Sequence, residues 1–235
     1  MFFFSHPLIK LQKSCLKALE NKKLPKELRA FYERPMPTPQ SLLSDFKITS
    51  IDFETTGLNF NEDVVLSMGG ISFVKNSIDF STSFHKILNV DPSKIKGKAA
   101  VINMITPEQL IGGDNPYEAF LELLDKLSGG IVLTHCQVIE KNFLKKGLKL
   151  DDKIPLPMVF LDTMAIERSL LIHRGAIRPD DVRLNKIRER RGFPPYEAHN
   201  ALADSLATAE VFMAQLHDIY GKGPRYLKEV FDRSN

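Results

Sequence analysis

The chain has little cysteine and no long apolar run, and both shortages narrow its class. Its 235 residues include only Cys15 and Cys136, which lie far apart and outside any Cys-x-x-Cys pair. This argues against a disulfide framework and a zinc site and favours a reducing compartment, so we expect a cytoplasmic protein. No stretch approaches the ~20 apolar residues that span a bilayer. The apolar start, residues 1–4, lacks the order of a secretory signal, so we expect no membrane association.

Tryptophan is absent, and neither sign of charge dominates. Lysine and arginine number 32 against 29 aspartates and glutamates, which gives a net charge of +3. This mild positive balance suits a polyanionic partner, although it is also common among other proteins. Hydrophobic residues make up 43% and charged residues 26%, as in soluble globular proteins. The length allows one domain of ordinary size plus an appendage.

The first 45 residues differ from the rest. Apolar residues recur at helical spacing from Leu8 to Leu19, which predicts an amphipathic helix. Three prolines within residues 35–39 predict an extended connector. Packing of this helix on the main domain is the preferred interpretation, and docking on a partner protein is the alternative. We therefore divide the chain into an N-terminal helical extension (1–45), a main domain (46–220) and a C-terminal tail (221–235).

The main domain is predicted to be α/β. Three strands in a meander precede alternating helices and strands, which favours a mixed five-stranded sheet with helices on both faces. The predicted strands cover residues 48–53, 64–74, 78–84, 131–134 and 158–161, and the predicted helices cover 116–127, 138–146, 163–171, 182–191 and 200–216.

The strongest local signal is Asp-Phe-Glu-Thr-Thr-Gly, which runs from Asp52 to Gly57 at the end of the first strand. Side chains two apart on a strand point to the same face, so Asp52 and Glu54 project together. Two adjacent carboxylates repel each other. A hard cation such as Mg²⁺ or Mn²⁺ offsets this repulsion because it prefers carboxylate oxygens. Taken alone, the pair also fits an acidic strand end in solvent.

Two further segments carry acids and a histidine. Glu140 lies in the first turn of a predicted helix, where a carboxylate meets the positive end of the helix dipole. Asn200 fits an N-cap, which places His199 just before the last long helix and Asp204 inside it. That arrangement lets both side chains converge on one site, where an imidazole accepts a proton from water near neutral pH. Each residue alone also fits an ordinary surface position.

Together these segments resemble the DnaQ-like exonucleases of the DEDDh type. The matching motifs are Asp52-x-Glu54-Thr-Thr-Gly, His-x-x-x-Ile-acid-x-x-Phe-Leu around Glu140, and His199-Asn-Ala-x-x-Asp204. They occur in the family's order over residues 46–217, and they resemble those of the exonuclease domain of the DNA polymerase III epsilon subunit. Glu140 stands where most relatives carry Asp, and residues 103–106 replace the His-Gly-Ile-Thr of many relatives.

The resemblance implies a ribonuclease H-like fold and metal-dependent 3′→5′ exonuclease activity. Two divalent ions, Mg²⁺ or Mn²⁺, would lie astride the scissile phosphate and release nucleoside 5′-monophosphates. Asp52, Glu54 and Asp204 would hold the ion that activates water, Asp52 would bridge to the second ion, and Glu140 would complete that second site. His199 would accept the proton of the attacking water.

Substrate contacts are expected just after the first two acids and on the second motif. The resemblance implies that Thr55, Leu58 and Phe143 contact the terminal nucleotide. The five lysines and arginines within residues 183–191 fit either phosphate contacts or a solvated face, and the solvated face is the preferred interpretation. The pair Asp162-Thr163 is expected to give structural support.

The expected partner is a nucleic acid with single-stranded or frayed 3′ ends, with DNA favoured over RNA. Because the additional sequence is N-terminal, a stand-alone or accessory exonuclease is preferred to a replicative proofreader. An exoribonuclease of the oligoribonuclease or tRNA-trimming type is an alternative, since carboxylates bind metal and phosphate and not the sugar. An inactive nucleic-acid-binding module is a third reading, disfavoured because all five catalytic positions hold competent residues.

Overall fold

The structure, a computed structural model of the chain, describes residues 6–74, 77–94, 105–172 and 179–235. The apolar start at residues 1–4 lies outside the described residues. Within the described part of the chain, no helix is long and apolar enough to cross a membrane. The two cysteines are free.

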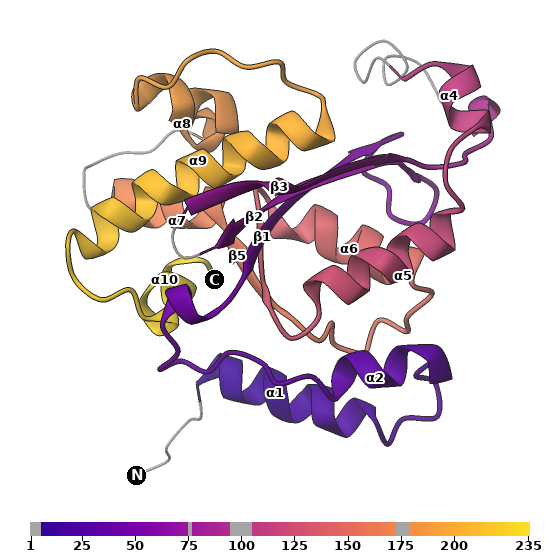
Figure 1. Cartoon of the computed structure of the whole chain (residues 1–235), viewed down its shortest axis with the longest axis horizontal. Coiled ribbons are helices and arrows are strands. Elements are labelled where there is room, and N and C mark those ends of the chain that lie inside the picture. The colour runs from indigo at the N-terminus through magenta and orange to yellow at the C-terminus, as the bar shows by residue number, and fades with distance from the viewer. Residues whose placement is uncertain (1–5, 75–76, 95–104, 173–178) are drawn as a thin grey trace.

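A mixed five-stranded sheet forms the centre of the protein, in the order β3-β2-β1-β4-β5 (Figure 1). The strands β1 (Ile48–Thr55), β2 (Val65–Val74) and β3 (Ser77–Ile87) form an antiparallel meander. The strand β4 (Ile131–Thr134) runs parallel to β1, and β5 (Val159–Asp162) runs parallel to β4. The predicted α/β class and sheet are thereby confirmed.

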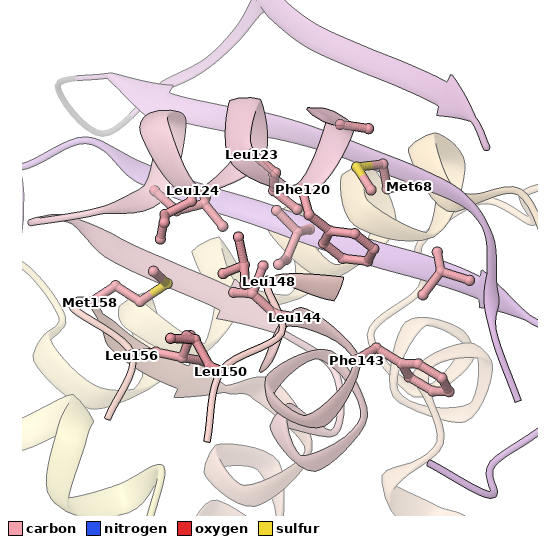
Figure 2. Close-up of a cluster of buried hydrophobic side chains, with 14 of the residues drawn as sticks. Met68, Phe120, Leu123, Leu124, Phe143, Leu144, Leu148, Leu150, Leu156 and Met158 are labelled. Carbon is pink, nitrogen blue, oxygen red and sulfur yellow. The ribbon is translucent and has the colours of Figure 1, made fainter. Parts of the chain in front are cut away.

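Helices cover both faces of the sheet (Figure 1). One face carries α5 (Pro116–Leu127) and α6 (Gln137–Gly147), whose apolar sides form a core with the sheet (Figure 2). The other face carries α7 (Thr163–Ile172) and α9 (Ala201–Tyr220), and α8 (Leu184–Arg190) packs on α9. The helix predicted over 182–191 is shorter, because Arg183 adopts an extended backbone before α8 begins.

The remaining short elements connect these layers. They are α4 (Pro107–Ile111) and the 3₁₀ turns Lys26–Leu28, Leu43–Asp45, Pro92–Lys94 and Pro179–Val182.

The N-terminal extension packs on the main domain through α1 (Pro7–Ala18) and α2 (Arg29–Tyr32). The apolar side of α1 reaches both cores, with Cys15 in the α5/α6 core and Leu8 in the core beneath α9. The hydroxyl of Tyr32 donates a hydrogen bond of 2.7 Å to the Pro155 carbonyl, just before β5. The extension therefore lies near the start of β5.

The C-terminal segment contains a helix, α10 (Leu227–Arg233), where the sequence analysis expected only a tail. Leu227, Val230 and Phe231 are buried in the core beneath α9. The imidazole Nε2 of His6 lies 2.9 Å from an Asp232 carboxylate oxygen, which joins the start of α1 to α10. The two ends of the described chain therefore stabilise the same region.

We predict that Leu8→Ala destabilises the whole protein. Leu8 is 0% exposed, and removing a buried leucine leaves a cavity that costs about 2–4 kcal/mol. The matched control is Leu16→Ala on the same helix, because Leu16 is 59% exposed. Urea unfolding followed by circular dichroism measures both variants. Equal, small losses in the two variants would contradict packing of the extension.

Candidate active site

The position of the site depends on a close approach between β2 and the first turn of α9. Asp52 of β1 pairs with Gly69 of β2. A Cβ atom on Gly69 would lie 2.3 Å from the Leu202 amide nitrogen, so only glycine permits this approach. The Ser50 hydroxyl also donates to the Ser205 carbonyl at 2.7 Å. The start of α9 is thereby held against the strand that carries Asp52.

This approach brings three predicted acids together. Carboxylate oxygens of Asp52, Glu54 and Asp204 all lie within 4.8 Å of one another. Asp52 and Glu54 share one face of β1, as predicted, and the register of β1 against β2 shifts directly after Glu54. Within the described ranges, this is the only group of three or more acids, histidines or cysteines in an arrangement suited to a metal ion.

The fourth predicted acid, Glu140, lies outside that group but close to Asp52. It occupies the first turn of α6, is 2% exposed, and its Oε2 atom has no hydrogen-bond partner among the described residues. The residue at the N-cap of this helix, Cys136, has a φ of 86° and gives no side-chain cap. Asp162 caps it instead, since its carboxylate accepts from the amides of Cys136 at 3.1 Å and Gln137 at 2.9 Å. Asp162 thus gives structural support, as expected.

Burial and mutual repulsion make ionisation of the acids costly. Burial, reinforced by the charges of Glu140, Asp204 and Glu54, raises the pKa of Asp52 well above its usual range. Burial and then Asp204 raise the pKa of Glu54 to about 7. Burial, with a smaller contribution from Asp162, also raises the pKa of Glu140. The metal-free site therefore favours the neutral forms of Asp52, Glu54 and Glu140 more than water does.

In the described part of the chain, residues 6–74, 77–94, 105–172 and 179–235, no lysine or arginine side chain pairs with any of the four acids. Oxygen-rich, negatively charged sites of this kind suit hard divalent cations. The unpartnered oxygen of Glu140 also fits a further ligand. The residues therefore suit a divalent metal.

His199 lies directly before α9, as predicted. Its φ of 66° is unusual for a residue other than glycine, and its amide donates to Asp204 Oδ2 at 2.8 Å. Asn200 caps the helix by accepting from the amides of Leu202 and Ala203. His199 and Glu54 line one cavity of about 130 Å³, together with Ser67, His85, Ile87, Ile105, Gln109, Glu197, Ala198 and Asn200.

Tyr196, which was not among the residues predicted from the sequence, also contacts an acid of the site. Its hydroxyl donates a 2.6 Å hydrogen bond to Asp204 Oδ1. Burial, together with this bond and the charge of Asp204, raises the pKa of Tyr196, so the phenol stays a donor. No local pattern identifies such a residue eight positions before its acceptor.

The three predicted substrate contacts differ in exposure. Leu58 is 64% exposed on the loop after β1. Phe143 is 1% exposed, belongs to the buried cluster drawn in Figure 2, and packs edge-on against Phe60. Phe143 therefore offers no free face to a nucleotide in this structure. Thr55 is half-buried, and its hydroxyl donates to the Gly57 carbonyl at 2.9 Å. Residues 103–106 replace the His-Gly-Ile-Thr of many relatives, and two of them, Asn103 and Met104, lie outside the described residues.

The carboxylate of Asp63 fixes the conformation of the loop that carries Leu58. One carboxylate oxygen of Asp63 accepts from the Thr56 hydroxyl at 2.8 Å, and the other accepts from the Asn59 amide at 2.8 Å. Gly57 is required in this turn, because a Cβ atom there would lie 2.5 Å from the Asp63 carboxylate. Leu58 is therefore exposed on a loop of defined conformation.

The cations around α8 serve mainly the scaffold. Lys186, Arg188, Arg190 and Arg191 form ion pairs with nearby acids. These pairs are Lys186–Glu189, Arg188–Glu210, Arg190–Glu167, Arg191–Glu167 and Arg191–Asp218. Arg188 is only 4% exposed, so the preferred interpretation of a solvated face does not hold for this residue.

Fold and site together define an α/β protein of the ribonuclease H-like type with a partly buried carboxylate cluster. The exonuclease family model matches residues 49–212. The chain therefore belongs to the exonuclease family, as its motifs indicated.

Relatives of the chain include proteins named as DNA polymerase III and as ribonuclease T. The chain is 29% identical over 174 residues to the DNA polymerase III PolC-type of Thermotoga maritima, covering 74% of this chain but 12% of that protein. It is 26% identical over 170 residues to the DNA polymerase III subunit epsilon of Treponema pallidum, covering 72% and 75%. It is 28% identical over 182 residues to a ribonuclease T of Shewanella denitrificans, covering 69% and 76%.

Solved structures share the fold. Escherichia coli exonuclease I in complex with a dA16 oligonucleotide superposes with a TM-score of 0.63 at 16% identity, covering 80% of this chain and 42% of that one. Cell-death related nuclease 4 gives a TM-score of 0.60 at 15% identity, covering 77% and 65%. At these identities the likeness establishes the ribonuclease H-like architecture alone.

We predict that Glu54 makes the metal-free protein less stable as pH rises. Its pKa is about 7 in the folded protein, above the ordinary 4.5. The stability it contributes is therefore complete below about pH 4.5 and is lost as pH rises through about 7. Unfolding in EDTA at pH 5 and pH 8 measures the loss. We expect Glu54→Gln to reduce the difference in the free energy of unfolding between the two pH values by on the order of 2 kcal/mol.

Two comparisons complete that experiment. Glu33→Gln is the control, since Glu33 is exposed, and it should leave the pH dependence unchanged. Adding Mn²⁺ at pH 8 should stabilise the wild type, because ligand binding favours the folded state. If Glu54→Gln unfolds with the pH dependence of the wild type, the raised pKa of this carboxylate does not account for the loss of stability.

Proposed function

We propose that the chain is a metal-dependent 3′→5′ exonuclease that shortens single-stranded or frayed ends of nucleic acids. The observation that carries this proposal is the group of Asp52, Glu54 and Asp204, whose oxygens lie within 4.8 Å without a basic partner among the described residues. Membership of the exonuclease family supports the same reaction class. A structural acid cluster would instead be expected to have arginine or lysine partners.

Asp52, Glu54 and Asp204 would hold one divalent ion, and Asp52 and Glu140 would hold a second. Bound there, Mg²⁺ or Mn²⁺ would lower the pKa of water and offset charge on the leaving 3′ oxygen. The unpartnered Glu140 Oε2 supports this role, and glutamate reaches one methylene further than the aspartate of most relatives. The acids thus supply the ligands and leave proton transfer to other groups.

His199 would accept the proton of the attacking water. His199 borders the cavity that Glu54 also lines, and an imidazole accepts protons near neutral pH. The bond from its amide to Asp204 fixes its backbone relative to the acids. Attack on phosphorus with departure of the 3′ oxygen releases nucleoside 5′-monophosphates.

DNA is the favoured substrate. The DNA polymerase III relatives and the oligonucleotide complex of exonuclease I support it, whereas the relative named ribonuclease T keeps RNA as a second candidate. The exposed Leu58 would pack against the terminal nucleotide, with Thr55 beside it. Nothing in the site favours an inactive binding module, since all four acids and His199 are present.

We predict a metal-dependent ladder from a single-stranded DNA labelled at its 5′ end. Shortening should require Mg²⁺ or Mn²⁺ and stop in EDTA. Asp52→Asn should lower the rate at least about 10³-fold through loss of a metal ligand, and His199→Ala about 10²–10³-fold through loss of the base. A matched RNA, run in parallel, assigns the substrate class by its relative rate.

The control is Asp151→Asn, which removes an acid that pairs with Lys23 on the surface and should leave the rate unchanged. A wild type that binds both strands but shortens neither would favour the inactive binding module. Immediate release of the labelled terminal nucleotide would indicate the opposite polarity.

A further inference from the structure

We propose that Tyr196 is a positioning residue for the metal site, because its hydroxyl fixes the carboxylate of Asp204. This inference rests on the proposed function only in taking Asp204 as a metal ligand. Tyr196 itself neither coordinates metal nor contacts substrate in this role.

Three donors hold the Asp204 carboxylate. Oδ1 accepts from the Tyr196 hydroxyl at 2.6 Å, and Oδ2 accepts from the amides of His199 at 2.8 Å and Asn200 at 3.2 Å. An ionised carboxylate has about four lone-pair sites. The three donors occupy three of them, with both donors on Oδ2 coming from the backbone. By this count, the remaining site lies on Oδ1, the oxygen whose direction Tyr196 sets.

The phenol is itself fixed by a buried arginine. The guanidinium of Arg188 lies 4.9 Å from the centre of the Tyr196 ring, a distance typical of cation–π contacts. Arg188 is buried and forms an ion pair with Glu210 of α9. Its Nη2 also donates to the Pro194 carbonyl at 3.2 Å. Tyr196 lies in the loop between α8 and α9, and it contacts Arg188 of the first helix and Asp204 of the second.

The hydrogen bond from Tyr196 matters because the neighbouring carboxylates repel that of Asp204. Asp52 and Glu54 both repel the Asp204 carboxylate. Without the phenol, only Oδ2 remains anchored, and Oδ1 is free to turn away from the other two acids. The ligands must then be reassembled whenever a cation binds, which weakens binding. The backbone donors and the Asn200 cap stay in place, so the helix itself persists.

The test is Tyr196→Phe, which removes the hydroxyl and keeps the ring beneath Arg188. Calorimetric titration with Mn²⁺ alone, without nucleic acid, should show about tenfold weaker binding than in the wild type, the size expected for a hydrogen bond to a charged group. The control is Tyr117→Phe, since Tyr117 donates a similar 2.8 Å bond to Glu27 on the surface. It should bind Mn²⁺ like the wild type.

A second set of measurements separates positioning from folding. Titrations at 10 °C, with the native circular dichroism spectrum confirmed, report on folded protein even if the variant melts earlier. Half-saturation by Mn²⁺ in the nuclease assay should rise about tenfold, whereas the KM for DNA at saturating Mn²⁺ should stay within twofold. A merely structural role would change both. Mn²⁺ affinity within twofold of the wild type would overturn the inference.

The two proposals fail in different ways. A wild type that binds Mn²⁺ but cuts no nucleic acid would contradict the proposed function, while a tenfold loss in Tyr196→Phe would still support the positioning role. A wild type that cuts DNA, with a Tyr196→Phe variant of unchanged metal affinity, would contradict only the positioning role.

Discussion

The contact between Gly69 and the first turn of α9 is the constraint on which the site depends. Backbone meets backbone there, at distances that exclude any side chain on Gly69. Because Gly69 pairs with Asp52, the same contact brings Asp204 beside two acids that lie about 150 positions earlier in the chain. The left-handed backbone of His199 and the Asn200 cap let the chain enter the helix at that point.

The resulting cluster places charge where burial makes it costly. Burial and mutual repulsion act in the same direction on Asp52 and Glu54, whereas Arg188, Arg190 and Arg191 form ion pairs with other acids. The basic residues near the site therefore stabilise the packing of α7, α8 and α9 and leave the cluster uncompensated. A divalent cation bound there would offset this repulsion and would add to the stability of the fold.

Patterns within one element predicted much of the structure. The alternation around Asp52 and Glu54 and the Asn200 cap both depend on neighbours within a few positions, and the structure agrees with both. Interactions between distant segments were missed. Asp162, which caps α6, follows Cys136 by 26 positions and Gln137 by 25 positions. The hydrogen bond from Tyr196 to Asp204 depends on how α8 and α9 pack.

Two expectations differed from the structure for identifiable reasons. Phe143 fits an apolar substrate contact by its place in the motif, but its helix turns it into the core against Phe60. The C-terminal segment looked like a tail because it is short. Its apolar residues Leu227, Val230 and Phe231 nevertheless follow helical spacing and are buried. That spacing was a readable signal for α10.

The N-terminal extension is part of the same folded unit. Its helix α1 contributes to both cores, and it packs near the start of β5, whereas the acids lie at the other end of the parallel strand β1. The apolar stripe that first raised docking on a partner protein is thus already occupied within the chain. Among the described residues of this segment, Leu16 is the large apolar side chain that stays exposed.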